Sequence, residues 1–263
     1  MMSLTARVKK MARLALGLAL FALISVPAAH AGVVYATGFE NPPFTIGDLV
    51  GQDGWSAFGS TIITVENSFV YAGSQAVFVN GPGSASQSGP FHADSPSGPM
   101  IDLSAELYIS SSSTEGGWQF AATGPALTGF IGGVDLYPDA VLPATDDIDL
   151  ITGSFPQVGT IALNTWNNFN FLFDMTAQTY SFYLNGSLVQ AGAPFCGNNS
   201  GPCNGADVSS YSDSLFDGFG GPANENDDGF MDNFNLSDTP EPGSLLLFGS
   251  GLALLIRRKL TRG

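Results

Sequence analysis

Lysine and arginine are absent from the whole central part of this chain. All eight cations of the 263 residues lie near the two ends, in 7–13 and 257–262, while all 23 carboxylates lie between residues 32 and 256. A domain without cationic side chains cannot neutralise phosphates, which excludes nucleic acid as a partner. Acidic polysaccharides would be repelled unless divalent cations bridge them, so neutral glycans or calcium ions are the expected partners. The alternative is that the acidic surface only keeps the protein soluble.

Cysteine and histidine are also scarce. Cys196 and Cys203 are the two cysteines, separated by six residues in a loop rich in turn formers. In an exported protein such a pair is predicted to form a disulfide, because a redox motif would be more closely spaced. His92 is the one histidine beyond the N-terminal segment, and no serine motif accompanies it that could complete a catalytic triad. We expect His92 to be a surface loop residue.

A helical period of 3.6 residues is missing between residues 32 and 238, and short alternating runs replace it. Apolar and polar side chains alternate from Ile101 to Ser110, and Phe169, Phe171 and Phe173 repeat this rhythm. Period two is typical of strands with one buried face, so the fold class is all-β, a two-sheet sandwich or jelly roll. Further expected strands are Val33–Phe39, Thr61–Val65, Gln75–Val79, Trp118–Ala122, Thr179–Leu184, Ser187–Gln190 and Phe230–Leu236. Long loops are expected at Ser84–Pro99 and Pro194–Asp213.

The N-terminus has the three parts of a secretory signal peptide. Four cations between Arg7 and Arg13 precede the apolar run from Leu14 to Val26, and Ala29-His30-Ala31 supplies a small-x-small cleavage site. The alternative, a buried N-terminal helix, does not explain this order. We expect signal peptidase to remove residues 1–31, so that the mature protein is exported.

The C-terminus is also built of three parts. Pro240-Glu241-Pro242 precedes an apolar run from Leu245 to Ile256, and a basic end follows. This segment resembles the PEP-CTERM tail of Gram-negative, exopolysaccharide-producing bacteria, and the resemblance implies processing by an exosortase. A helix over the 14 residues Gly243–Ile256 would be about 21 Å long and short of the roughly 30 Å hydrocarbon core, so it predicts a transient inner-membrane anchor. An ordinary, unprocessed anchor is the alternative.

The predicted domain boundaries are therefore a signal peptide over 1–31, a β-sandwich over 32–238 and a sorting segment over 239–263. Within the sandwich, an aromatic strand from Trp166 to Asp174 is followed by a second strand that ends in Asn185-Gly186, a pair suited to a tight hairpin. This segment resembles concanavalin A-like, laminin-G-type lectin sandwiches. The resemblance implies a lectin-like fold, which also hosts glycanases and inert spacers.

A calcium site is predicted where the first and last strands of the domain meet. Gly38-Phe39-Glu40 and the segment from Asp227 to Phe234 resemble the terminal strands of jelly-roll carbohydrate-binding domains, in which acids share a structural calcium ion. The resemblance implies Glu40, Asp228 and Asp232 as ligands, with Asp227 as a further one, because calcium prefers several hard oxygens. Solvated loop carboxylates are the alternative.

Two further motifs concern glycans. Asp146-Asp147-Ile148-Asp149 invites comparison with the active-site strand of laminarinase-type glycanases, but that chemistry needs two glutamates and the chain has none between Glu115 and Glu225. A glycanase of that kind is therefore not expected.

Trp55 and Trp118 lie among glycines and serines and are candidates for stacking against sugars. A place in the core is the competing and favoured interpretation for each. Trp166 is expected in the core because of its position in a strand.

These observations predict an exported, exosortase-processed protein of the cell surface or extracellular matrix. We expect it to bind glycan, or to have a structural role, in the exopolysaccharide of a biofilm, and not to be an enzyme. A glycan-active hydrolase or lyase on the same fold is the alternative, and a spacer without any ligand is a third possibility.

Overall fold

A computed structural model describes the central domain of the protein. It covers residues 32–59, 61–80, 87–110, 116–125, 129–139, 142, 144–198, 203, 208–219 and 228–239, all within one compact unit, Ala31–Pro240. The predicted signal cleavage residues Ala29 and Ala31, the sorting residues Pro240, Glu241 and Pro242, and the expected helix over 243–256 lie outside the described residues. In the part of the chain that is described, no helix has the length and hydropathy needed to cross a membrane.

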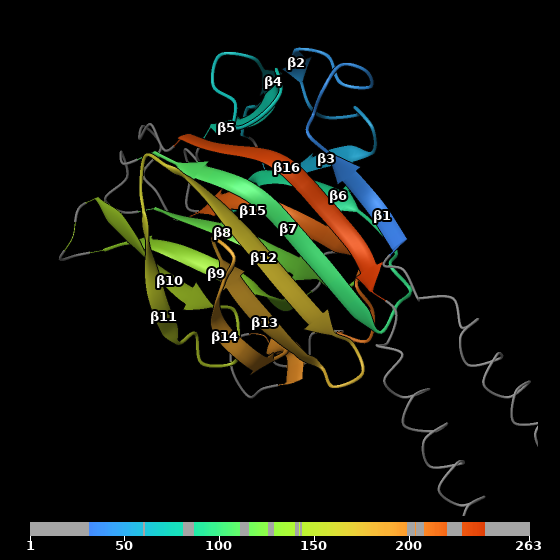
Figure 1. Cartoon of the computed structure of the whole chain (residues 1–263), viewed down its shortest axis with the longest axis vertical. Helices are drawn as coiled ribbons and strands as arrows, with labels where there is room; N and C mark the ends of the chain where they lie inside the picture. Colours follow the sequence, from blue (N-terminus) through green and yellow to red (C-terminus); the bar gives the residue numbers. More distant parts are fainter. Residues whose placement is uncertain are drawn as a thin grey trace, which may run out of the picture. The chain divides into compact units, whose positions relative to one another are not determined.

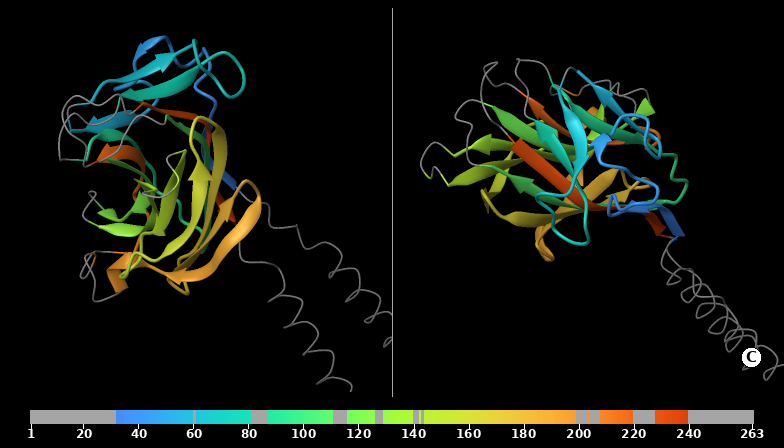
Figure 2. Two further views of the ribbon diagram at one scale, coloured as in Figure 1. Left: turned by 90° about the vertical axis from the view of Figure 1, so that its left-hand side faces the viewer. Right: turned by 90° about the horizontal axis from the view of Figure 1, so that it is seen from above.

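The domain consists of two antiparallel β-sheets that face each other as layers (Figures 1 and 2). The nine-stranded sheet has the order β14-β13-β12-β7-β16-β5-β4-β2, with β1 also paired to β16. Its strands are β1 (Gly32–Thr37), β2 (Gly47–Asp48), β4 (Ile63–Glu66), β5 (Ala76–Asn80), β7 (Met100–Ile109), β12 (Trp166–Asp174), β13 (Thr179–Leu184), β14 (Ser187–Pro194) and β16 (Asp228–Thr239).

The seven-stranded sheet has the order β11-β10-β9-β8-β15-β6-β3. Its strands are β3 (Trp55–Phe58), β6 (Gly89–Ala93), β8 (Gly117–Thr123), β9 (Phe130–Pro138), β10 (Thr145–Leu150), β11 (Gln157–Ala162) and β15 (Asp213–Phe219). The predicted all-β, jelly-roll type of sandwich is confirmed.

The core lies between the two sheets and follows from strand periodicity. Phe169, Phe171 and Phe173 of β12 are fully buried, and the residues between them point to the other face. The rings of Phe171 and Phe120 are 5.7 Å apart, so side chains from both layers meet in one aromatic core. Burial of this core is the main favourable contribution to folding.

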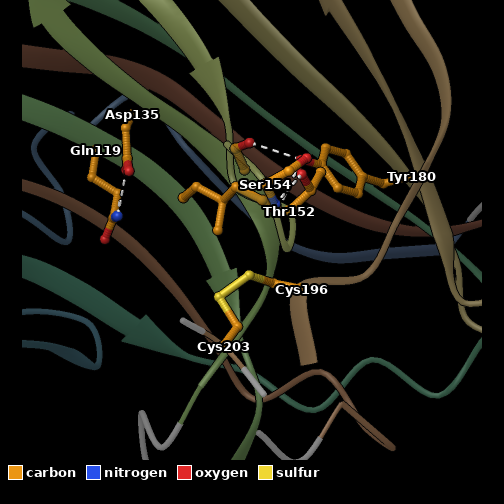
Figure 3. Close-up of a disulfide and its surroundings, with 9 residues drawn as sticks. Gln119, Asp135, Thr152, Ser154, Tyr180, Cys196 and Cys203 are labelled. Carbon is orange, nitrogen blue, oxygen red and sulfur yellow. Dashed lines mark hydrogen bonds between the residues drawn. A yellow bond between two sulfur atoms is a disulfide. The ribbon is translucent and has the colours of Figure 1, made fainter. Parts of the chain in front are cut away.

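Tyr180 links the two layers through its hydroxyl group. It belongs to β13, and its Oη lies 3.1 Å from the carbonyl oxygens of both Gly133 and Ile151 on the opposite sheet (Figure 3). A Cβ atom at Gly132 would lie 2.5 Å from the Tyr180 ring, so the close approach requires glycine there. The buried phenol is thereby satisfied, as a polar group in a core must be.

The two segments predicted to be long loops contain regular structure of different kinds. The segment Ser84–Pro99 is not only a loop, because it contains strand β6, which is short and interrupted by proline in sequence. The segment Pro194–Asp213 contains a 3₁₀ helix over Cys196–Asn198. The disulfide between Cys196 and Cys203 is confirmed, with 5.3 Å between the Cα atoms.

Candidate functional site

A row of aromatic side chains crosses the nine-stranded sheet on the face that points away from the core. Trp166 of β12 pairs with Tyr108 of β7, Tyr108 pairs with Phe230 of β16, and Phe230 pairs with Phe78 of β5. Directly opposed residues on neighbouring strands share a face, so the four rings form one line across four strands. Three strand spacings make this line about 14 Å long.

Two more rings come from the segment between β4 and β5. The Phe69 ring stacks on Trp166 with 5.7 Å between centroids and packs edge-on against Tyr108 at 4.5 Å. Tyr71 lies beside Trp166 at 5.7 Å. We call these six residues the aromatic face: Phe69, Tyr71, Phe78, Tyr108, Trp166 and Phe230. Phe69 and Tyr71 are 36% and 48% exposed, so rings of this cluster contact solvent.

Polar groups run alongside the aromatic face. The Asn168 side-chain amide donates to Glu106 Oε1 at 3.0 Å, and the Asn170 amide donates to Asp102 Oδ1 at 2.5 Å. Burial raises the pKa of Glu106 and of Asp102 above their ordinary values, although the amide bonds oppose this. The sheet therefore presents stacked rings next to groups that donate and accept hydrogen bonds.

The tryptophans predicted to stack on sugars lie elsewhere. Trp55 and Trp118 are 1% and 2% exposed and belong to the core, so neither offers a ring face to a ligand. Trp166 was expected in the core but lies on the aromatic face, because it is out of phase with the buried Phe169, Phe171 and Phe173. This parity is visible in the sequence and is the signal that sequence reasoning missed.

Of the three predicted calcium ligands, Glu40 and Asp232 lie close enough for their charges to interact, but Asp228 does not join them. Asp228 and Asp232 are four residues apart on β16, about 13 Å along the strand. The oxygens of Glu40 and Asp232 accept hydrogen bonds from backbone amides, which are not metal ligands. Among the residues described, no three acidic, histidine or cysteine side chains form a group that could hold a metal ion. The residues thus do not fit a shared ion, and calcium binding stays a prediction.

A second row, of acids and an amide, crosses the face of the seven-stranded sheet that points away from the core. Asp149, Asp135, Gln119 and Asp217 are successive cross-strand partners. Gln119 Nε2 donates to Asp135 Oδ1 at 2.5 Å (Figure 3). Neither carboxylate oxygen of Asp217 has a hydrogen-bond partner in the described structure, and the residue is fully buried.

Burial dominates the electrostatics of this row. It raises the pKa of Asp135 to about 6, with the charge of Asp149 adding to the effect, and it raises the pKa of Asp217 well above the ordinary value. Asp147 and Asp149 of the compared glycanase motif lie in β10, and Asp149 joins this row. Because Asp135 and Asp217 are 4% and 0% exposed, a ligand cannot reach either in this conformation.

His92 is a buried strand residue, not the predicted surface loop residue. It is 6% exposed in β6, its ring stacks on Tyr35 at 3.9 Å, and its Nδ1 lies 2.9 Å from Asp94 Oδ2. Its Nε2 lies 3.1 Å from the backbone carbonyl oxygen of Asp53. Both partners can only accept, so satisfying them requires a proton on each ring nitrogen. Burial lowers the pKa of His92, but the bonds to Asp94 and Asp53 outweigh it and leave the pKa raised.

Comparison with known proteins explains the C-terminal end. Residues 238–259 match the family model described as PEP-CTERM protein-sorting motif. The chain carries a PEP-CTERM sorting motif. The motif implies an exported protein that transits the membrane and is processed by an exosortase. No curated protein matches the chain in sequence.

Solved structures resemble the sandwich at low sequence identity. A sialidase is 12% identical over 71% of this chain with a TM-score of 0.52, but this chain spans only 17% of it. An endo-1,3-β-glucanase from Streptomyces sioyaensis is 11% identical, with 82% of this chain and 99% of that chain covered and a TM-score of 0.51. The CBM22-1 xylan-binding domain of Paenibacillus barcinonensis Xyn10C is 14% identical, covering 81% and 99%, with a TM-score of 0.41. The likenesses to the sialidase and to the glucanase show the fold alone, because their sequence identities are only 12% and 11%.

Proposed function

We propose that this protein is a non-enzymatic, glycan-binding component of the cell surface or extracellular matrix, and that it binds neutral polysaccharide through the aromatic face. The observation that carries the proposal is the aromatic row from Trp166 to Phe78 with the exposed rings of Phe69 and Tyr71 beside it. Exposed aromatic groupings of this kind mark interaction sites more often than isolated apolar residues do.

The chemistry of the aromatic face suits a sugar. An aromatic ring has a negative face, which attracts the C–H bonds on the apolar side of a pyranose. The amide and carboxyl groups of Asn168 and Glu106 can exchange hydrogen bonds with sugar hydroxyls. A chain of neutral sugars can use both kinds of contact along one line.

The charge distribution supports a neutral ligand. No lysine or arginine occurs between residues 32 and 256, so a polyanion would meet only repulsion. Export with the PEP-CTERM motif supports a role outside the cell, where association with exopolysaccharide during biofilm formation is the proposed biological setting.

Binding to polysaccharides tests this function. The mature domain is incubated with insoluble β-glucan and xylan and with acidic alginate, and the bound fraction is measured. We expect retention on a neutral polymer, and roughly tenfold weaker binding after Tyr71→Ala or Trp166→Ala. Tyr183→Ala is the matched control, because Tyr183 is an aromatic residue of β13 that pairs with Asn170 on the same face outside the cluster. Unchanged binding in both variants would refute the site.

Processing by the exosortase is tested separately. Mass spectrometry of protein recovered from the producing bacterium should find a C-terminus near residues 240–243. Secreted protein with the basic end at residues 257–262 intact would contradict it.

A glycan-active enzyme is the second candidate, favoured by the raised pKa of Asp135, but it would require a movement that exposes this buried carboxyl group. A carboxyl group with a pKa of about 6 is suited to general acid catalysis, as the raised pKa of Asp135 would allow. Release of reducing sugar that is lost in Asp135→Asn would favour the enzyme over the binding protein. Retention without release supports the proposal made here.

A further inference from the structure

The segment between β4 and β5, residues 67–75, carries the two most exposed rings of the aromatic face and is held by carboxylates. Its first turn is closed by Glu66, whose Oε1 accepts from the Phe69 amide at 2.9 Å. Beyond Phe69, the acceptors come from parts of the chain that are distant in sequence. The position of Tyr71 therefore depends on residues outside its own segment.

Asp232 of β16 is the first of these distant acceptors. Its Oδ2 accepts from the amides of Tyr71 at 3.1 Å and Ala72 at 3.0 Å, and its Oδ1 accepts from the Asn233 amide at 2.7 Å. The residue is fully buried, yet its carboxylate is satisfied by three N–H groups. Asp232 thus holds the backbone on both sides of the Tyr71 Cα atom.

Glu40 is the second acceptor and holds the backbone of Ser74 and Gln75. Its Oε1 accepts from the Ser74 amide at 2.7 Å and from the Gln75 amide at 3.3 Å, and the Ser74 hydroxyl donates to Oε2. These hydrogen bonds lower the pKa of Glu40, as expected for a carboxylate that is bonded in its charged form.

The backbone of the segment is shaped around the Glu40 carboxylate. Gly73 has a φ of +72°, and a Cβ atom built there would lie 1.9 Å from Glu40 Oε1. Only glycine combines that φ with the absence of a side chain at this contact. The sequence therefore provides both the carboxylate and the space that it requires.

We propose that Glu40 and Asp232 are positioning residues for the aromatic face, which hold residues 71–75 so that Tyr71 and Phe69 lie against Trp166. The role rests on the proposed function and assigns to these two acids a task other than calcium coordination. We expect neither carboxylate to contact the glycan, because each is already engaged by backbone N–H groups. The contribution to affinity is pre-organisation, since a loop already ordered loses less freedom on binding.

The experiment measures the loop and the ligand independently. Amide hydrogen exchange of residues 71, 72, 74 and 75 is followed without glycan in the wild type, Asp232→Asn and Glu40→Gln. An amide side chain has only one acceptor oxygen, so each variant loses part of its hydrogen bonds. We expect roughly tenfold faster exchange at Tyr71 and Ala72 in Asp232→Asn, and at Ser74 and Gln75 in Glu40→Gln. Affinity for the polysaccharide that the wild type retains should fall roughly fivefold to tenfold in both.

Asp228→Asn is the matched control for these variants. Asp228 lies on the same strand and was predicted to share a calcium ion with Glu40 and Asp232, but it contacts none of the loop amides found here. We expect Asp228→Asn and treatment with EDTA to change neither exchange nor affinity. If Asp228→Asn has the same effects as Asp232→Asn and Glu40→Gln, or if EDTA accelerates exchange in the wild type, calcium coordination replaces the positioning role.

The remaining outcomes separate this inference from the proposed function. Faster exchange with unchanged affinity would overturn the positioning role and leave glycan binding by the aromatic face standing. A wild type that binds no polysaccharide would overturn both, whatever the amides do. Glu40 is partly exposed, so Glu40→Gln keeps the test decisive if Asp232→Asn does not fold.

Discussion

The two sheets of this sandwich differ in how far their outer faces are covered. The outer face of the nine-stranded sheet is only partly covered, and acids on this face have partners such as Asn168 and Asn170. The central strands of the seven-stranded sheet are buried on both faces, since β8 has no exposed residue and a second cluster around the disulfide covers Ala121 and Leu215. The difference teaches that the nine-stranded sheet offers exposed rings to a ligand, while Asp135 and Asp217 of the other sheet are closed in.

Removal of an inward-facing ring should have the largest effect. Phe171→Ala in β12 removes a fully buried ring that stacks on Phe182 at 5.0 Å, and it should lower the free energy of unfolding by about 3–5 kcal/mol. Leu172→Ala, the next residue on the outward face, should cost less than about 1 kcal/mol. Urea denaturation compares the two. Similar costs would mean that the outer face is covered as closely as the core.

The seven-stranded sheet should be sensitive to added atoms instead. A Cβ atom at Gly89 of β6 would lie 2.3 Å from the Phe216 carbonyl oxygen, a backbone atom that cannot rotate away. Gly89→Ala should therefore lower stability by about 1–3 kcal/mol. Gly159→Ala on the edge strand β11, where the nearest atom is 3.9 Å from the added Cβ, should be neutral or slightly stabilising. Thermal unfolding distinguishes them, and equal shifts would count against the close approach.

The buried acid of the seven-stranded sheet should respond to pH. The folded-state pKa of Asp217 is raised, so the wild type is favoured below the ordinary value near 4 and loses stability as pH rises through the folded-state pKa. Asp217→Asn removes this ionisation and should be more stable than the wild type at pH 8 by on the order of 1 kcal/mol or more. The advantage should vanish as the pH falls to about 4.

Asp102→Asn serves as the comparison from the other sheet. Asp102 already accepts from Asn170, so its replacement should give a smaller pH-dependent change than that of Asp217. Denaturant midpoints from pH 4 to 8 supply the measurement. A larger pH-dependent change in stability for Asp102→Asn than for Asp217→Asn would contradict the expected difference between the two sheets.

The smallest effect is expected at His92. Its folded-state pKa is raised, so its stabilising contribution is complete below the unfolded value near 6.5 and is lost as pH rises through the folded-state pKa. The change should be small, because burial and the hydrogen bonds of His92 act on its pKa in opposite directions. His92→Gln should flatten this part of the stability profile between pH 6 and 8. A profile identical to the wild type would show that folding does not change the pKa of His92.

The difference in burial between the two sheets also explains which strands could be predicted from the sequence. Alternation revealed β7 and β12 because one of their faces is polar, and it located the inward Phe169, Phe171 and Phe173 correctly. The strands β9 and β15 of the seven-stranded sheet were missed, because burial on both faces removes the alternation. Of that sheet only the strand Trp118–Ala122 was predicted.

The candidate site was harder to predict than the fold. It gathers Phe69, Phe78 and Phe230 from segments far apart in the chain, which only the pairing of β5, β16 and β7 brings together. The disulfide and the sorting motif were predictable because each is a local pattern. Glu40 and Asp232 were predicted as calcium ligands with Asp228, and the hydrogen bonds that they accept from the backbone of residues 71–75 have no signature in the sequence.

The pairing of the first and last strands has a consequence for how the domain is tethered. Gly32 of β1 is the Cα partner of Asp238 of β16, so both ends of the described domain leave the sandwich at one place. A membrane tether at either end would therefore attach to the same side of the domain. Cleavage outside residues 32–239 would remove no strand from either sheet. A short peptide joining residue 238 to residue 32 should therefore give a viable circular permutant, with new ends opened at the Asn185-Gly186 hairpin.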